Sequence, residues 1–491
     1  MSLPPIDEDE AVACTEEDKA ETESQPQATL AQMRTVLGRC GALLDALPTD
    51  AAGAVLARVD RPLIVAQVSK GWRAAVLGAT PRAPLRYVLD RAKYHASTSA
   101  AQYRYSTSKN GEMLGDLSVK CGKFDVVSIT ISGLHASFTD ASGLAALLPR
   151  CPHLASLDLS GNNLRLDTLP QLRECTALTT LDLSRIPGFG NGPMHLLNKF
   201  PPVLRELRLR DVGLYDESGM TGLLVALGNC TSLTHLDLCQ NRFYASALLP
   251  RILAQLPALE RLELSGTRMR QVAVRDAARS LQACTRLTYL DLSDLWCQDH
   301  RLETTVAANE IQELTDAGEE FMQMLASWPA LTYLDLGDMW LGADATHFAA
   351  SLLALPSLTF LNLSNGRLGT PEMTNITAAL PGMPALAELN MSASGIDEVG
   401  GQALVRVLPH CTALRTLRLT GNPLMSAGVQ GLAAALQECP KLTQLDLLRT
   451  QLESATIMEI ENAWEAQHEP RGDFSFTRRR GGVDCLATHD A

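Results

Sequence analysis

Apolar residues recur along most of the chain in the pattern L-x-x-L-x-L-x-x-N-x-L, in which x is any residue. Eleven copies follow one another, and a degenerate copy, "FDVVSITISGL", precedes them. The alternating L-x-L core predicts a short, half-buried strand, whereas later segments such as "AGVQGLAAALQEC" carry apolar residues at helical spacing. Each unit is therefore predicted to form a strand, a turn and a helix. The units begin at Phe124, Leu154, Leu178, Leu204, Leu233, Leu259, Leu287, Leu331, Leu358, Leu386, Leu414 and Leu442.

The spacing between units predicts how they assemble. Successive first leucines are mostly 26 to 29 residues apart, and a fixed period of this length is typical of a solenoid, in which each unit packs only on its neighbours. Parallel strands stacked at ~4.8 Å give an inner sheet of roughly 50 Å. The outer helices are bulkier than the strands, so we expect the sheet to curve into a horseshoe.

The motif resembles the repeat of the ribonuclease-inhibitor type of leucine-rich-repeat protein, and the resemblance covers about 340 residues. It implies an α/β fold, a leucine-rich-repeat solenoid with an inner parallel sheet and outer helices. The family's asparagine at the ninth motif position remains only at Asn162, Asn241 and Asn422. We therefore expect the asparagine hydrogen-bond ladder of the family to be interrupted.

Composition divides the rest of the chain. Residues 1–29 carry nine acidic side chains and one lysine and few large apolar residues, so they are predicted to be a disordered acidic tail. A small helical N-terminal module is expected at 30–95, the solenoid of about twelve repeats at 118–462 and a polar C-terminal tail at 469–491. One spacing between units increases to 44 residues, which indicates an acidic insertion at 296–330. Most of the net charge of -13 lies in the tail and the insertion, so the solenoid is nearly neutral.

The segment "LPTDAAGAVLARVDRPLIVAQVSKGW", residues 47–72, is similar to an F-box. The resemblance implies a helical module that docks on the small adaptor of a cullin-type ubiquitin ligase, while the repeats hold the substrate. The segment is a residue or two shorter than the usual pattern. The alternative is a plain helical cap that covers the apolar end of the solenoid. The residues that would bind the adaptor are Leu47, Pro48, Leu56, Leu63 and Trp72.

Several classes of function lack their sequence signatures. The chain has no phosphate-binding loop, no H-E-x-x-H, no G-x-S-x-G and no dinucleotide-binding glycine motif, so we predict that it is not an enzyme. A nucleic-acid partner would need a basic stripe, which is missing. No apolar run reaches the ~18 residues that a membrane span needs. The acidic N-terminus differs from a secretory signal, so we expect a cytoplasmic location, with the nucleus as the alternative.

Half of the twelve cysteines occupy one position, three residues before the first leucine of a unit. Other units place Pro, Leu, Trp or Met there, so the position requires apolar bulk and not a thiol. Cys239 is expected on an outward-facing strand position, where it would be the more accessible thiol. There is no C-x-x-C pair and no metal-ligand spacing, so we predict no metal and no cofactor. The six cysteines that occupy the shared position before the first leucine are Cys151, Cys175, Cys230, Cys284, Cys411 and Cys439.

Candidate binding residues lie at the third and fifth motif positions, which face outward on the concave side of the predicted sheet. Tyr289, Tyr333 and Phe360 occupy the third position in three consecutive units. Aromatic residues are enriched at interface hot spots, so this trio favours a contact site for a protein partner. Repetition of the motif is sufficient to explain most of the aspartates at the fifth position. The predicted partner-binding set is completed by His235, Asp237, Asp291 and Asp335.

These observations predict a non-enzymatic protein-protein interaction scaffold, with an F-box and leucine-rich-repeat substrate receptor of a cullin-type ubiquitin ligase as its specific form. One alternative is an adaptor subunit of a cytoskeletal or ribonucleoprotein assembly. Another is a regulator of a small GTPase, a group that usually carries a long acidic tail after the repeats. Here the acidic run is at the N-terminus, which disfavours that alternative.

Overall fold

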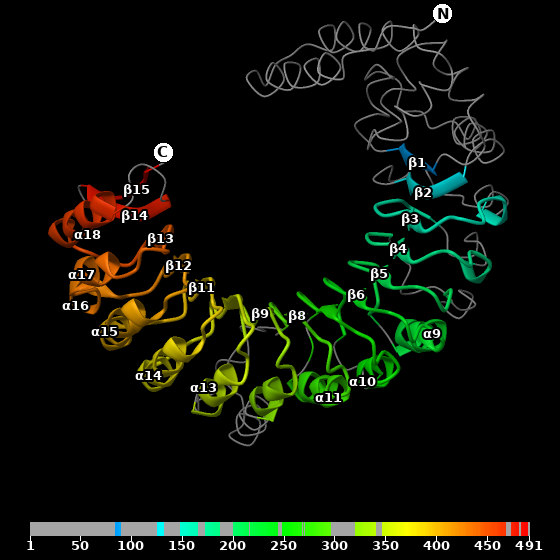
Figure 1. The fold of residues 1–491 in the computed structure, drawn as a ribbon, viewed down its shortest axis with the longest axis horizontal. Helices are drawn as coiled ribbons and strands as arrows, with labels where there is room; N and C mark the ends of the chain where they lie inside the picture. Colours follow the sequence, from blue (N-terminus) through cyan, green and yellow to red (C-terminus); the bar gives the residue numbers. More distant parts are fainter. Residues whose placement is uncertain are drawn as a thin grey trace, which may run out of the picture.

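The computed structural model of the chain describes residues 84–89, 125–131, 148–164, 172–186, 200–215, 217–243, 248–267, 269, 271–295, 320–339, 346–467, 473–480 and 483–489. These residues form a curved solenoid whose strands lie on the inner, concave side and whose helices lie on the outer, convex side (Figure 1). The predicted horseshoe of strand, turn and helix units is confirmed.

Fifteen strands form one sheet, and their order in the sheet is their order in the chain. All neighbours are parallel except the last pair. Twelve of the strands, β2 to β13, are the L-x-L cores of the twelve predicted units. The strands are β1 (Pro84–Leu89), β2 (Asp125–Ile131), β3 (Ser156–Asp158), β4 (Thr180–Asp182), β5 (Glu206–Arg208), β6 (His235–Asp237), β7 (Arg261–Glu263), β8 (Tyr289–Asp291), β9 (Tyr333–Asp335), β10 (Phe360–Asn362), β11 (Glu388–Asn390), β12 (Thr416–Arg418), β13 (Gln444–Leu447), β14 (Asp473–Arg480) and β15 (Val483–His489).

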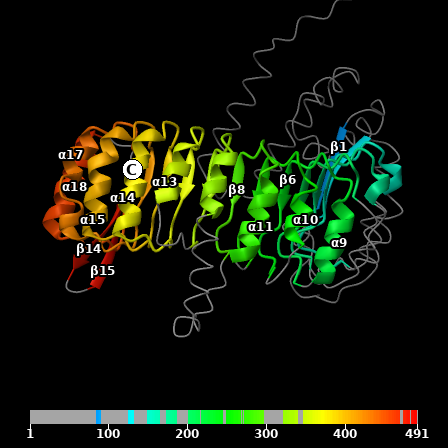
Figure 2. The same cartoon turned by 90° about the horizontal axis from the view of Figure 1, so that it is seen from below.

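The helices follow one another along the convex side, as the view onto that side shows (Figure 2). Among the described residues, short turns of 3-10 helix also occur, some of them at the end of an α-helix. The α-helices are α9 (Glu217–Leu227), α10 (Leu249–Leu253), α11 (Gln271–Leu281), α13 (Thr346–Leu353), α14 (Thr370–Ala379), α15 (Glu398–Val407), α16 (Met425–Gly428), α17 (Leu432–Gln437) and α18 (Ser454–Gln467). The 3-10 turns are η1 (Leu148–Arg150), η3 (Leu172–Glu174), η6 (Leu325–Ser327), η7 (Leu380–Gly382) and η8 (Leu408–His410).

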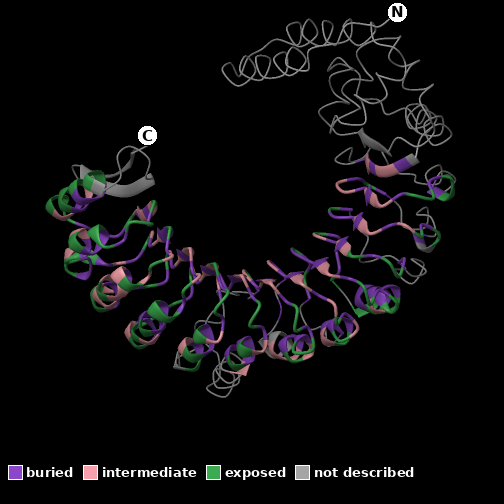
Figure 3. Cartoon of the chain, in the orientation of Figure 1, coloured by how far each residue is buried: buried purple, intermediate pink, exposed green. Residues whose placement is uncertain are grey.

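The core is a continuous apolar layer between the sheet and the helices (Figure 3). In the unit of β6, for example, Leu233, Leu236 and Leu238 are all 0% exposed. The position three residues before the first leucine is also inside: Cys230 is fully buried there, and Trp328 fills the same position three units later. The packing interpretation of the cysteines is therefore confirmed, since five of the six are buried and the sixth is half-buried.

The turns after β3 to β13 each place the eighth motif residue in the left-handed region, with φ between 49° and 74°. Its N–H donates to the carbonyl of the seventh residue in the next unit, at 2.9 Å from Asp211 to Cys239 and 2.7 Å from Gln240 to Ser265. The parallel ladder thus continues past the ends of the strands. The residues with this conformation are Gly161, Arg185, Asp211, Gln240, Gly266, Asp294, Asp338, Asn365, Ala393, Gly421 and Arg449.

The asparagine ladder is interrupted, as expected. Asn241 is buried; its amide oxygen accepts from Val212 N and Leu214 N at 3.2 Å, and its amide nitrogen donates to Leu209 O at 2.7 Å. Hydroxyl groups replace the asparagine in some units, as in Thr267, whose Oγ1 donates to Leu264 O. Gly366 has no side chain that could make such a bond. Apolar residues fill the position in four more units, and they are Ile186, Val212, Leu295 and Met339.

The sheet is longer than the sequence predicted. β1 lies within the segment expected to be a helical module, and β14 and β15 lie within the expected C-terminal tail. β14 extends the parallel sheet beside β13, and β15 then runs antiparallel to β14. Apart from β1, the predicted helical module at 30–95 lies outside the described residues, and so does most of the predicted insertion at 296–330. No helix in the part of the chain that the structure describes is both long and apolar enough to span a bilayer.

Candidate functional site

The third-position side chains of β8, β9 and β10 stack into one column. The strands are in register, with Tyr289 opposite Tyr333 and Tyr333 opposite Phe360. The ring centroids of the two tyrosines are 3.9 Å apart, those of Tyr333 and Phe360 are 4.2 Å apart, and adjacent ring planes differ by only 6° and 3°. We call these three residues the aromatic column. Arg261, the third residue of β7, extends it, because its guanidinium carbon lies 3.5 Å from the Tyr289 ring centroid.

Stacking decides which part of the aromatic column a ligand can reach. Both faces of Tyr289 and Tyr333 are occupied by neighbouring groups, so a ligand meets ring edges and hydroxyl groups. The three side chains are half-buried. Burial is the largest cause that raises the pKa of the Tyr333 hydroxyl, and a hydrogen bond with Tyr289 and the charge of Asp335 raise it further. Tyr333 therefore presents a neutral phenol.

The fifth-position carboxylates have a structural role in the turns. Asp335 Oδ1 accepts from the backbone N–H of Gly337 at 2.9 Å, and Asp291 Oδ1 accepts from Ser293 at 3.0 Å. Asn362 accepts the same bond from Ser364 N, so this bond requires a short side chain with an acceptor oxygen but does not require a negative charge. This accounts for the repeated aspartates. The same bond is made by Asp158, Asp182, Asp237, Asn390 and Asp446.

Asp291 and Asp335 face each other across β8 and β9 and form what we call the carboxylate pair. Asp335 is 9% exposed. Burial first, and then the charge of Asp291, raise its pKa to about 6 against hydrogen bonds from Gly337, Asn362 and Tyr333. Burial likewise raises the pKa of Asp291, with smaller contributions from the charges of Glu263 and Asp237. The pair is thus a desolvated site of concentrated negative charge.

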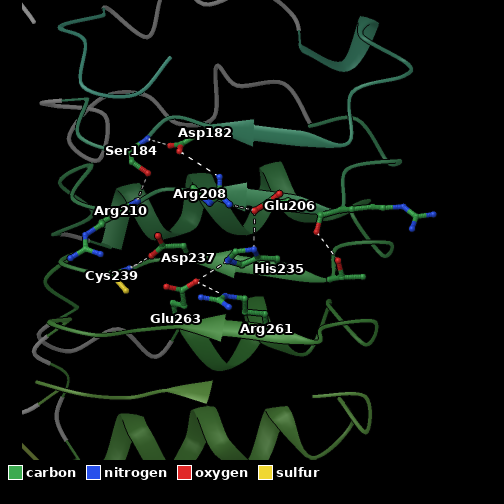
Figure 4. A network of polar contacts seen from close by, with 12 residues as sticks. Asp182, Ser184, Glu206, Arg208, Arg210, His235, Asp237, Cys239, Arg261 and Glu263 are labelled. Atoms are coloured by element: carbon green, nitrogen blue, oxygen red, sulfur yellow. Dashed lines mark hydrogen bonds and ion pairs between the residues drawn. The ribbon is translucent and has the colours of Figure 1, made fainter. Parts of the chain in front are cut away.

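The concave face of β4 to β7 carries a different arrangement, a chain of opposite charges that we call the charge ladder (Figure 4). His235 lies between two carboxylates, with Nδ1 3.0 Å from Glu206 Oε1 and Nε2 2.9 Å from Glu263 Oε1. Burial favours a high pKa for Glu263, but hydrogen bonds from His235 and Arg261 outweigh it and lower that pKa to about 2. The members of the charge ladder are Asp182, Arg208, Glu206, His235, Glu263 and Arg261.

A model of the leucine-rich repeat matches residues 150–166, and the same unit recurs through twelve consecutive strands of the sheet. The chain is a leucine-rich-repeat solenoid. Among solved structures it is similar to an internalin from Listeria monocytogenes, with 15% identity, a TM-score of 0.42 and coverage of 71% of this chain and 86% of that chain. It is also similar to a leucine-rich-repeat protein of Leptospira interrogans, with 14% identity, a TM-score of 0.39 and coverage of 70% and 83%. Both TM-scores are low, so the assignment rests on the repeats themselves.

The leucine-rich-repeat solenoid brings together five of the seven predicted partner-binding residues, the aromatic column and the carboxylate pair. His235 and Asp237 belong to another part of the face, because Arg261 and Glu263 separate them from the column. Arg261 and Glu263 were not among the binding residues that the sequence predicted. The signal was present, since Arg261 occupies the third position of the unit just before Tyr289. The predicted adaptor-binding residues lie outside the described residues.

Cys239 contradicts the expectation of an accessible thiol. It is 1% exposed, and burial, together with the charge of Asp237, raises its thiol pKa. Possible ligand atoms of Asp237, Cys239 and Glu263 lie within 4.8 Å of one another, a set that could hold a metal ion. Each acid already has a protein partner, however: Asp237 accepts from Cys239 N at 2.9 Å, and Glu263 binds Arg261 and His235. These contacts account for the cluster without a metal.

Proposed function

We propose that this solenoid is a non-enzymatic protein-interaction scaffold and that the concave face around β8 to β10 contacts its partner. Leucine-rich-repeat arrays in general offer extended concave surfaces for binding. The observation that supports this location is the stack of Tyr289, Tyr333 and Phe360 on consecutive strands. The buried leucines and the turns do not require aromatic residues at the third position, where other units place Ser, Thr or Glu.

The column suits a protein contact for energetic reasons. Three rings held by one another and by Arg261 lose little conformational freedom when a partner binds. They also offer apolar edges beside two hydroxyl groups, which is the combination that makes tyrosine frequent at interface hot spots. A rigid, partly exposed aromatic surface is thus prepared before the partner arrives.

The test is a matched pair of substitutions in the full chain, after affinity capture and mass spectrometry have identified a partner that is then purified. Tyr333→Ala removes the middle ring and is expected to weaken binding by about 2 kcal/mol. Thr180→Ala changes the same motif position in β4, and we expect it to leave the affinity nearly unchanged. Melting temperatures verify that both variants are folded. Equal affinities for the two variants would place the contact site elsewhere.

The more specific proposal is a substrate receptor of a cullin-type ubiquitin ligase, with residues 47–72 docking on the small adaptor. It is supported by the F-box-like sequence and by its position before the repeats. The full chain should then bind purified adaptor, and the double substitution Leu47→Ala and Pro48→Ala should abolish this binding while leaving the Tyr333-dependent partner bound. A full chain that never binds the adaptor would exclude this role. The captured partner would then decide between an adaptor of a cytoskeletal or ribonucleoprotein assembly and a small-GTPase regulator.

A further inference from the structure

The concave face differs in how its charges are compensated. In β4 to β7, Asp182, Glu206 and Glu263 each lie within 4 Å of a cationic group of the charge ladder, and Asp237 is the one acid of these four strands for which the described residues show a turn bond but no ion pair. In β8 and β9, the carboxylate pair has no ion-pair partner among the residues that the structure describes. Two more aspartates follow in the adjacent turns, Asp294 and Asp338, at the eighth motif position of the same units.

The charge of the carboxylate pair is not needed for folding. The turn bond to the residue two positions later is made equally by Asn362 in β10 and by Asn390 in β11. An amide in place of Asp291 or Asp335 would keep that bond and remove the repulsion between two partly desolvated anions. The negative charge at this point of the sheet is therefore surplus to the fold, which points to an external cation.

A protein cation suits the geometry better than a metal ion. One oxygen of each aspartate is already used by a backbone N–H, at 3.0 Å for Asp291 and 2.9 Å for Asp335, so the pair can offer few free oxygens. A calcium ion takes six to eight oxygen ligands. An ammonium or guanidinium group needs only one or two acceptors and forms strong charge-assisted hydrogen bonds with them.

We propose that Asp291 and Asp335, assisted by Asp294 and Asp338, bind a lysine or arginine side chain of a protein segment whose neighbouring residues pack on the edges of the aromatic column. This inference rests on the proposed function and specifies the partner's chemistry. It also assigns the two parts of the site different tasks. The column supplies apolar contact, and the carboxylates select a basic segment and accelerate its association in a salt-sensitive manner.

The test uses the full chain and two synthetic fluorescent hexapeptides, one with alternating lysine and valine and one with glutamine in place of lysine. The site variant carries Asp291→Asn and Asp335→Asn. The control variant carries Asp158→Asn and Asp446→Asn, which have the same motif position, the same turn bond and the same change of charge. We expect the site variant to weaken binding of the lysine peptide about ten-fold or more and the control less than about two-fold. The glutamine peptide should bind weakly to all three proteins.

A second readout locates the contact. A carbodiimide condenses a lysine amine of the peptide with a nearby carboxylate, with loss of water, and peptide mapping by mass spectrometry identifies the amide. The expected products are at Asp291, Asp335, Asp294 or Asp338. Equal weakening in the two variants, no measurable binding of the lysine peptide, or products spread equally over Asp158 and Asp446 would each overturn the inference.

The natural partner separates this inference from the proposed function. If Tyr333→Ala weakens binding of the natural partner and the site variant does not, the aromatic column is the contact site and the basic-segment inference is wrong. If neither change affects the partner, the concave contact around β8 to β10 is wrong as well. If Tyr333→Ala and the site variant both weaken binding of the partner, and only the effect of the site variant diminishes with added salt, the proposed function and the basic-segment inference are both supported.

Discussion

At the scale of single residues, the fifth motif position combines two properties that can be separated. In the units that place aspartate or asparagine there, the acceptor oxygen closes the turn, and only aspartate adds a charge; three other units place Arg208, Glu263 or Arg418 at this position. At Asp335 the charge carries a cost, because the side chain is 9% exposed and faces Asp291. That cost is the physical origin of the raised pKa of about 6.

Asp335→Asn should therefore stabilise the fold in a pH-dependent way. The folded pKa of about 6 exceeds the ordinary value of 3.8, so the folded protein binds the proton more tightly than the unfolded chain. Ionised Asp335 lowers stability fully above about pH 6 and has no such effect below about pH 4. We expect the variant to gain about 1–3 kcal/mol at pH 7.5 and almost nothing at pH 4. Chemical denaturation at both pH values measures this, and an equal gain at both would contradict the explanation.

Cys239 shows where residue-level prediction from the sequence fails. The alternation of inward and outward side chains holds only while the chain remains a strand, and β6 ends at Asp237. Two residues later the chain is entering the left-handed turn at Gln240, and the thiol is directed toward buried carboxylates. A period of two, extended past the end of the strand, therefore gives the wrong exposure.

At the scale of elements, the units differ in how the ninth residue stabilises the turn. Asn241 satisfies two backbone N–H groups and two carbonyls inside the core, whereas Thr267 in the next unit bonds a single carbonyl. Units with Val212 or Leu295 at this position use apolar packing instead. The turns are thus unequal in strength along the solenoid.

Asn241→Ala should be much more damaging than Thr267→Ala. The first leaves several buried polar backbone groups unsatisfied, and we expect it to lower the free energy of unfolding by about 2–4 kcal/mol. The second removes one hydrogen bond and should cost about 1 kcal/mol. Urea denaturation of the two variants provides the comparison. Similar losses would show that water or neighbouring groups replace the asparagine.

The sequence predicted the twelve repeat strands because each L-x-L core buries its apolar residues. It did not predict β1, β14 or β15, which lack the repeated leucines. A signal existed for β14, since "DFSF" alternates apolar and polar residues, but two phenylalanines in a polar tail are weak evidence for a strand. The aromatic column was predicted because register follows from repetition. The same register places Arg261 beside Tyr289, but the stacking of its guanidinium on the ring and the contacts of the charge ladder depend on side-chain rotamers, which repetition does not determine.

At the scale of the whole molecule, each repeat contacts mainly its two neighbours, so stability is the sum of local terms. A destabilising substitution in a central repeat should then let the repeats on its two sides unfold separately. Leu290 is 0% exposed in β8, and Leu290→Ala is expected to cost about 3 kcal/mol at that point. We expect unfolding in two steps, with hydrogen exchange accelerated first in β7 to β9 while β11 to β13 stay protected.

A control at the end of the array distinguishes this behaviour from general destabilisation. Leu445→Ala in β13 removes an equally buried leucine but has repeats on mainly one side. It should cause local fraying of the C-terminal units and leave the exchange of β4 to β9 unchanged. A single cooperative transition in both variants, with uniform loss of protection, would show that the solenoid unfolds as one unit.

The left-handed residue in every turn has a further consequence for how stable the molecule could become. Glycine occupies the position in only three of eleven units, at Gly161, Gly266 and Gly421. A residue with a side chain there carries roughly 1–2 kcal/mol of strain. Glycine avoids this strain, but it loses more conformational entropy on folding, which offsets about half of the gain. Ala393 has no polar side chain that could compensate through local hydrogen bonding. Replacing such residues by glycine, one repeat at a time, is therefore expected to stabilise the array without altering the core or the aromatic column.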